Sequence, residues 1–148
     1  MNISQKCQYA VRATLELAKR FGNGPTPIGE VAARQAIPPR FLEIILNEMK
    51  QGGFVESRRG VQGGYMLIPK PADLTVGQII RFVDGSFDPV KCLGETAASC
   101  EIRSRCALME LWTQAKTAVE SVYDGTNFQQ LAEREFALER AGSGEYHI

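Results

Sequence analysis

Apolar and small residues recur every three or four positions near the start of the chain, which is the spacing of one face of an amphipathic helix. Between residues 3 and 21 they form one stripe, and Arg12, Glu16 and Lys19 lie on the other side. The glycines and the proline of residues 22–25 end this helix, because these residue types interrupt helical backbone. A short second helix is predicted over residues 28–33.

A third helix is predicted to begin at Pro38 and Pro39, where a missing amide hydrogen costs little, and to end at Gly52 and Gly53. The apolar positions that we expect to face the core are Phe41, Leu42, Ile45, Leu46 and Met49. The outward positions are Arg40, Glu43, Ile44, Asn47 and Lys50.

Alternating residues next predict a β-hairpin, called the wing below. Residues 54–58 and 65–68 are its strands, and the glycine-containing segment 59–64 is its turn. Thr75 is the predicted N-cap of a fourth helix over residues 76–83. Three short helices followed by a hairpin is the order of a winged helix-turn-helix domain, which we assign to residues 1–84.

The outward side of the third helix carries side chains that suit DNA. Arg40 can bind a phosphate or a guanine edge, Asn47 an adenine, and Lys50 a phosphate. Ile44 can contact a thymine methyl group, and Glu43 either accepts from cytosine or repels phosphate.

The wing offers a second candidate contact, formed by Arg58, Arg59, Gln62 and Gly63. Arginine suits a narrow minor groove, and glycine lets backbone amides approach a phosphate closely. The alternative for this segment is a solvated hairpin turn.

The last strong helical pattern covers residues 107–123. Its stripe consists of Leu108, Leu111, Trp112, Ala115, Ala118, Val119 and Val122. The stripe must be buried, either against the chain's own domain or in a seam with a second copy, and the pattern leaves both open. Residues 107–140 are assigned to this helix and a C-terminal segment, and residues 141–148 to a flexible tail.

Three cysteines lie in the segment 85–106, called the cysteine loop below. Cys92, Cys100 and Cys106 are separated by seven and five residues, wider than the paired C-x-x-C spacing of zinc sites. An iron–sulfur cluster tolerates this spacing, and Lys91, Arg103 and Arg105 would favour the thiolate forms. Unligated thiols are the alternative, with zinc a weaker one.

Composition is that of a globular protein. The 148 residues are 44% hydrophobic and 23% charged, with no net charge. Residues 1–90 carry 11 Lys and Arg against 8 Asp and Glu, whereas residues 91–148 carry 6 against 9, so positive charge gathers in the predicted DNA-binding domain. The pattern predicts no membrane span and no export signal, and hence a cytoplasmic protein.

Several segments together resemble the Rrf-type (Rrf-two) family of bacterial transcription regulators, which has IscR-, NsrR- and RirA-like groups. The resemblance rests on residues 3–13, on residues 37–46 of the third helix, on the wing sequence of residues 58–65, on residues 75–77, and on the three cysteines that precede Leu111 and Trp112. It implies a homodimer that binds pseudo-palindromic operator DNA, in many members under the control of an iron–sulfur cluster held by three such cysteines.

The resemblance has one departure. IscR-like members have a histidine three residues after the last cysteine, where this chain has Met109. A thioether is a poor ligand for these clusters, so the candidates for a fourth ligand are Cys7 and the region of Gln8 of the partner subunit. For Cys7, which lies on the apolar stripe of the first helix, a buried free cysteine is the alternative.

The sequence therefore predicts a mainly α fold with a small β-hairpin, in which a winged helix-turn-helix domain precedes a long C-terminal dimerisation helix. The predicted function is transcription regulation by a homodimer whose operator affinity depends on the cluster. A cluster-free thiol-based redox regulator and a winged-helix protein-interaction module remain alternatives. We expect that the protein is not an enzyme and has no small-molecule substrate. A catalytic cysteine needs a nearby general base, and the only histidine, His147, is far from the cysteines in the sequence.

Overall fold

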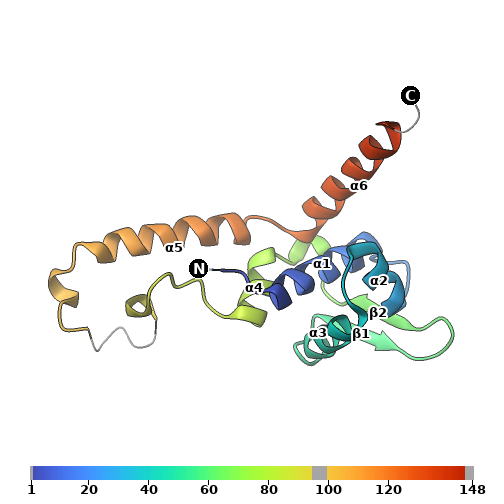
Figure 1. The fold of residues 1–148 in the computed structure, drawn as a ribbon, viewed down its shortest axis with the longest axis horizontal. Helices are drawn as coiled ribbons and strands as arrows, with labels where there is room; N and C mark the ends of the chain where they lie inside the picture. The colour runs from blue at the N-terminus through green and yellow to red at the C-terminus, as the bar shows by residue number, and fades with distance from the viewer. Residues whose placement is uncertain (1, 95–99, 146–148) are drawn as a thin grey trace.

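The computed structural model describes residues 2–94 and 100–145, the last three of these for the backbone only. Its first part contains α1 (Gln5–Lys19), α2 (Ile28–Gln35), α3 (Pro39–Gln51) and the antiparallel pair β1 (Val55–Arg58) and β2 (Gly64–Leu67) (Figure 1). In the pairing register Val55 lies opposite Leu67 and Arg58 opposite Gly64.

The second part contains two long helices and several short ones. Its elements are η1 (Pro71–Asp73), α4 (Val76–Asp84), η2 (Lys91–Leu93), η4 (Arg103–Arg105), α5 (Leu108–Asp124) and α6 (Phe128–Glu145). Among the described residues, none of the helices is long and apolar enough to cross a membrane.

Local sequence explains where these helices begin. The Ser4 side chain accepts from the backbone N–H of Cys7 and caps α1. Thr75 and Gln78 form a reciprocal capping box at the start of α4, which confirms the predicted N-cap. Pro39 occupies the first turn of α3, where no amide hydrogen is needed.

One apolar core joins the winged helix-turn-helix domain to the later helices. Leu17, Leu42, Leu46 and Ile79 from α1, α3 and α4 are almost fully buried in it. Phe128 at the start of α6 is also fully buried there, so the C-terminal helix is anchored on the domain. Mainly helical structure with a small hairpin, as predicted, is therefore confirmed.

Phe41 departs from the predicted core of α3. Its side chain is 58% exposed, whereas the other four predicted core positions of that helix are buried. The ring packs beside Tyr9 of α1, with the two ring centroids 6.5 Å apart. At 100° per residue, position 41 lies on the flank of α3 rather than under it, which is why the apolar pattern misplaced it.

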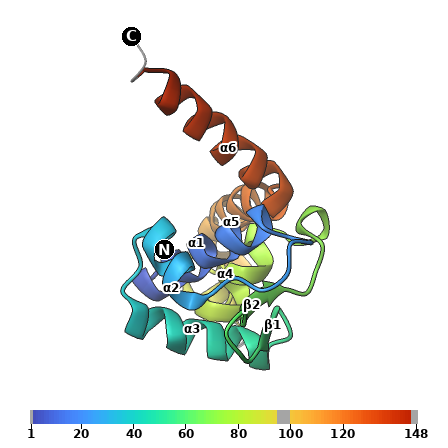
Figure 2. The same ribbon diagram turned by 90° about the vertical axis from the view of Figure 1, so that its right-hand side faces the viewer.

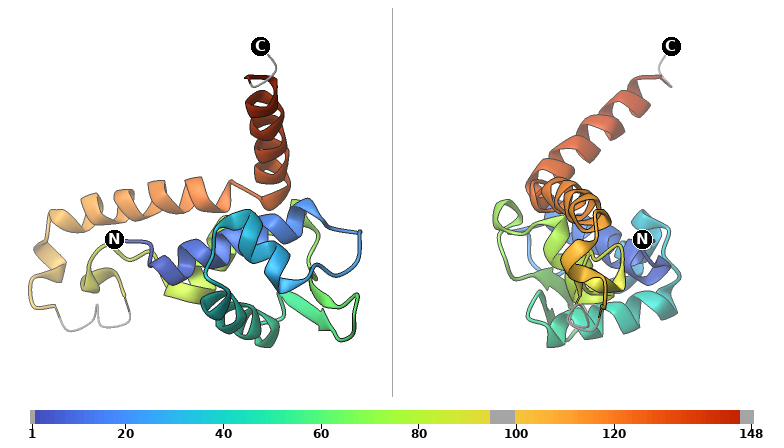
Figure 3. Two further views of the ribbon diagram at one scale, coloured as in Figure 1. Left: turned by 45° about the vertical axis from the view of Figure 1, so that its right-hand side comes forward. Right: turned by 90° about the vertical axis from the view of Figure 1, so that its left-hand side faces the viewer.

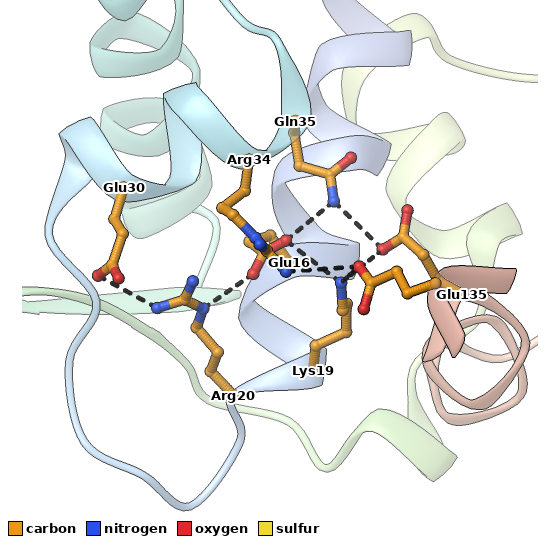
Figure 4. A network of polar contacts seen from close by, with 8 residues as sticks. Glu16, Lys19, Arg20, Glu30, Arg34, Gln35 and Glu135 are labelled. Carbon is orange, nitrogen blue, oxygen red and sulfur yellow. Dashed lines mark hydrogen bonds and ion pairs between the residues drawn. The ribbon is translucent and has the colours of Figure 1, made fainter. Parts of the chain in front are cut away.

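Glu16 and Lys19 also depart from the prediction, which placed them on an outward face. Glu16 is 1% exposed and accepts from Arg20 Nε at 2.8 Å and from Gln35 Nε2 at 3.0 Å (Figure 4). Lys19 Nζ lies 3.0 Å from the carboxylate of Glu135 on α6. The side of α1 opposite the core is covered by α6, and the ion network fills that contact.

The network keeps Glu16 ionised. Burial alone raises the pKa of this carboxyl, but the hydrogen bonds from Arg20 and Gln35 and the charge of Lys19 outweigh burial. The pKa of Glu16 is therefore below its ordinary value.

The two long helices leave the domain in different directions (Figure 2, Figure 3). At the far end of α5 is the cysteine loop, and the wing lies at the opposite end of the molecule (Figure 1). None of the residues of α5 is buried, and Leu108, Leu111 and Val122 are each more than half exposed. The predicted helix is confirmed. From its apolar stripe Val119 packs against the core of the chain's own domain, as does Tyr123 beside the stripe.

Beyond α5 the chain forms a second long helix that the sequence pattern did not separate. Helix α6 extends through Glu145, five residues into the range 141–148 that was predicted to be a tail. The buried anchors Phe128 and Ala132 and the charges that face α1 explain why this polar segment is helical.

Candidate nucleic-acid interface and cysteine loop

The outward positions of α3 lie as the sequence predicted. The side chains of Arg40, Glu43, Ile44, Asn47 and Lys50 are all exposed. Lys50 Nζ donates to Ser57 Oγ of β1 at 2.7 Å, which links the end of α3 to the wing. The set places cationic, anionic, amide and apolar side chains on the outward side of one helix.

The wing presents its two arginines to solvent. Arg58, Arg59 and Gln62 are exposed, and Gly63 is half-buried. A Cβ at Gly63 would collide with the carbonyl oxygen of Arg58. Gly63 therefore has a structural role in the turn, which the sequence analysis did not identify.

Gly64 fixes the wing to the rest of the domain. Its φ of +151° lies in the region that favours glycine, and a Cβ there would collide with the backbone of Thr26. Thr26 and Tyr65 exchange two backbone hydrogen bonds, of 2.8 and 2.9 Å. The wing is therefore held against the α1–α2 connection.

Polar contacts between α4 and α5 connect the domain to the long helix. Arg81 donates to both carboxylate oxygens of Asp124 and also to Glu120, at 3.0 Å. The hydrogen bonds that Arg81 donates hold the pKa of Asp124 below its ordinary value, and its pairing with the carboxylates of Asp124 and Glu120 raises the pKa of Arg81. A Cβ at Gly77 would collide with the Asp124 carboxylate, so the close approach needs glycine.

A second ion pair ties the beginning of the cysteine loop to α5. Lys116 Nζ lies 2.6 Å from Asp88 Oδ1, and this hydrogen bond, with that of Ser86, holds the pKa of Asp88 below its ordinary value. These contacts were not predicted from the sequence. The available signal was the spacing of Lys116, Glu120 and Asp124, which are four residues apart on one side of the helix.

The three cysteines of the loop are free thiols, each half-buried. Arg103 Nη1 donates to the backbone carbonyl of Cys92 at 3.1 Å, so the turns at Cys92 and before Cys106 touch. In the described ranges, no three cysteine, histidine or acidic side chains are arranged to hold a metal ion. Residues 95–99, between Cys92 and Cys100, lie outside the described residues.

The donor set still fits an iron–sulfur cluster in chemical type. Three soft sulfur ligands come from one loop, neither locked in disulfides nor sealed in the core. Arg103 and Arg105 lie in η4, directly before Cys106, and supply positive charge beside it.

The two candidates for a fourth ligand differ in accessibility. Cys7 is fully buried in the core, and burial, followed by the charge and hydrogen bond of Asp84, raises the pKa of its thiol to about 12. Gln8 is exposed on α1, and its Nε2 donates to the backbone carbonyl of Ile3 at 3.2 Å. Of the two positions, only Gln8 is open to a second subunit.

A family model described as Rrf2, iron-dependent transcriptional regulator, matches residues 3–134. The chain belongs to the Rrf2 family. It is 35% identical over 131 residues to the HTH-type transcriptional regulator IscR of Aliivibrio salmonicida (strain LFI1238), covering 88% of this chain and 77% of that protein. It is also 35% identical over 132 residues to the HTH-type transcriptional regulator CymR of Bacillus subtilis (strain 168), covering 89% and 90%.

Solved structures of Rrf2-type regulators have the same fold. CymR (YrzC), described as the global cysteine regulator of B. subtilis, superposes with a TM-score of 0.76 at 34% identity, covering 90% of this chain and 98% of that chain. T. potens IscR superposes with a TM-score of 0.70 at 30% identity, covering 91% and 88%. The winged helix-turn-helix architecture is thus shown, and with it DNA-binding transcription regulation rather than enzyme activity.

Proposed function

We propose that this Rrf2-family chain is a homodimeric transcription regulator whose operator affinity is controlled by an iron–sulfur cluster bound to Cys92, Cys100 and Cys106. One observation carries the proposal. The cysteine loop lies at one end of α5, and the other end of α5 is held to the DNA-binding domain by Arg81 and Asp124. A structural change at the cysteine sulfurs can therefore be transmitted through α5 to the DNA-binding domain.

The DNA contacts follow from exposure and side-chain chemistry. In this proposal the N-terminal part of α3 enters the major groove, where Arg40, Glu43, Ile44 and Asn47 read bases and Lys50 meets phosphate. Arg58, Arg59, Gln62 and the Gly63 backbone of the wing contact the adjacent backbone or minor groove.

Dimerisation is supported by the exposed stripe of α5. A single chain leaves Leu108, Leu111 and Val122 in water, which is unfavourable for three large apolar side chains on one helix. A second copy of α5 would cover them and would set the separation of the two recognition helices. Half-sites one helical turn apart require one fixed separation.

The cysteine thiolates would hold the cluster, and Arg103 and Arg105 would offset its negative charge. The matching family model is described as iron-dependent, which supports iron as the metal. When bound, the cluster supplies a redox-active and iron-dependent crosslink between the three sulfurs. A fourth ligand would come from solvent or from the partner subunit, where the exposed region of Gln8 is the accessible candidate.

The direct test is anaerobic purification followed by a visible spectrum and assays for iron and sulfide. We expect a coloured protein with both elements in stoichiometric amounts. Cys92→Ala, Cys100→Ala and Cys106→Ala should each lose the colour, whereas Cys7→Ala should keep it because its thiol is buried in the core. Colourless, metal-free wild-type protein with intact thiols would contradict the proposal.

Thiol chemistry without a cluster is the second candidate. Two observations favour it: the described cysteines do not form a ready metal site, and a solved relative at 27% identity is described as an oxidised form of Staphylococcus aureus CymR. In that case the protein is colourless, and mild oxidation of Cys92, Cys100 or Cys106 alters operator affinity. If the protein shows no salt-dependent binding to any DNA duplex, that result would favour the alternative that it is a winged-helix protein-interaction module.

A further inference from the structure

We propose that Tyr9, Phe41 and Ile44 form a pocket that receives the 5-methyl group of a thymine in the operator. The inference rests on the proposed DNA-binding function and deepens it, because it adds a residue of α1 and a flank position of α3 to base reading. Ile44 alone was a candidate from sequence, whereas Tyr9 and Phe41 were not.

The pocket has a volume of about 320 Å³ and is lined by Gln5, Lys6, Tyr9, Phe41, Ile44 and Ile45. Phe41 and Ile44 are 58% and 55% exposed, so two large apolar side chains lie side by side in water on the flank of α3. Leaving such groups exposed costs free energy unless a ligand covers them. An apolar group is therefore the expected occupant.

The pocket is already organised before any ligand arrives. The Tyr9 and Phe41 ring centroids are 6.5 Å apart, and Gln5 Nε2 donates to Tyr9 Oη at 2.9 Å. Lys6 Nζ is paired with Glu48 of α3, which ties α1 and α3 together beside the pocket. The Tyr9 ring is thus held by a hydrogen bond, and an ion pair joins the two helices that carry Tyr9 and Phe41.

Its position on the helix identifies the occupant. Phe41 and Ile44 lie in the N-terminal half of α3, the part of a recognition helix that reaches base edges. Ile44 is shared between the pocket and the outward row of Arg40 and Asn47. In the major groove, the apolar feature of a base edge is the thymine methyl group.

Charge around the pocket favours a nucleic acid over an apolar protein partner. The Arg12 guanidinium lies 5.5 Å from the centre of the Tyr9 ring, and Arg40, the residue before Phe41, is exposed. Both are placed to meet the phosphates that flank a base in the groove.

The test compares thymine with uracil, which differ only in this methyl group. Duplexes bound by the full-length protein are first selected from a random library, and each thymine of the half-site is then replaced by deoxyuridine, symmetrically in both half-sites. At one position we expect the dissociation constant to rise about fourfold for each half-site, the equivalent of the roughly 0.8 kcal/mol gained by burying one CH₂ group. At the other positions it should stay unchanged.

Variants connect that effect to the pocket. Phe41→Ala and Ile44→Ala should bind the thymine and uracil duplexes equally, because the group that covers the methyl has been removed. Leu138→Ala, which truncates a 54% exposed side chain on α6, is the matched control and should keep the difference. Circular dichroism and the melting temperature establish that each variant is folded.

Three results would overturn the inference. Tight binding with no sensitivity to uracil at any position contradicts the pocket alone and leaves the proposed function standing. The same holds if Phe41→Ala is folded and keeps the full thymine preference. If selection recovers no duplex at all, the proposed DNA-binding function fails, and the pocket fails with it.

Discussion

Arg81 of α4 donates to both carboxylate oxygens of Asp124 at the end of α5, at 2.6 and 2.8 Å. Two parallel hydrogen bonds to one carboxylate fix orientation as well as distance. The two residues are 43 positions apart in the chain, and the cysteine loop lies between them. In the proposed function, this pair is the contact through which a change in the cysteine loop reaches the DNA-binding domain.

The first prediction removes that contact. Asp124→Asn leaves the cysteine loop intact but removes the negative charge that Arg81 binds, so the bidentate ion pair is lost. Both side chains are about 40% exposed, so we expect only about 0.5–1 kcal/mol of lost stability. The ratio of operator affinities between the cluster-loaded and cluster-free protein should instead shrink, because α5 no longer orients the domain.

Anaerobic titration of both forms against one selected duplex measures that ratio. Glu133→Gln on α6, which also neutralises an exposed carboxylate, is the control and should keep the wild-type ratio. An Asp124→Asn protein with an undiminished ratio would show that coupling takes another route.

The second prediction concerns the buried network under α6. Glu16→Gln removes the charge that Lys19 and Arg20 both face, and we expect a loss of roughly 1–3 kcal/mol in the free energy of unfolding. Because the pKa of Glu16 is lowered in the folded state, ionised Glu16 stabilises the fold above its unfolded pKa, about 4.5, and this stabilisation is lost as pH falls through the folded pKa.

Melting temperatures between pH 3 and pH 7 test this. The melting temperature of the wild-type protein should exceed that of Glu16→Gln by a large margin at pH 7, and this margin should become smaller below about pH 4.5. Glu30→Gln is the matched control, since Glu30 also binds Arg20 but is half exposed. A constant difference at every pH would show that Glu16 does not titrate as described.

The third prediction tests how the wing is held. Gly64→Ala places a Cβ against the Thr26 backbone at a φ that alanine rarely adopts, which should cost about 1–3 kcal/mol. Operator affinity should fall about tenfold or more, because the two arginines of the wing lose their position. Gly29→Ala, in open space within α2, should be neutral or slightly stabilising.

Duplex titration and thermal melting of both variants provide the comparison. Equal affinity of the folded Gly64→Ala and Gly29→Ala proteins would exclude the wing as a DNA contact.

The fourth prediction concerns the exposed stripe of α5. Leu111→Asp places a charge in the proposed seam between two copies, and we expect a shift from dimer to monomer. Thr117→Asp adds the same charge on another side of α5 and should stay dimeric. Light scattering coupled to size-exclusion chromatography measures the mass, and a wild-type monomer would reject the proposed seam.

Sequence reasoning predicted the parts of the fold that depend on local pattern. The α1–α4 order, the Thr75 cap and the outward side of α3 all follow from periodicity and capping chemistry. Its errors were at Phe41, Glu16 and Lys19, where burial depends on which helix packs alongside. Since α6 is mostly polar, its own sequence did not indicate that it would cover the charged side of α1.

In the candidate site, too, features that depend on local sequence could be predicted, whereas contacts between distant segments could not. Exposure of Arg40, Asn47 and Arg58 could be predicted, because an amphipathic helix and a hairpin turn expose such residues by geometry. The Arg81–Asp124 contact could not, since it depends on two segments 43 positions apart meeting in space. The roles of Gly63, Gly64 and Gly77 were likewise visible only once the backbones that they approach were placed.

In the proposed function, the cysteine loop controls operator affinity, and one titration distinguishes a protein with this control from one without it. Anaerobically purified protein is titrated against a selected duplex at fixed salt, first as isolated and then after its iron has been removed by a chelator. We predict at least a tenfold difference in dissociation constant for the wild type and none for Cys92→Ala. Equal affinities of the two wild-type forms, with iron and sulfide confirmed in the first, would show that the cluster does not control operator binding.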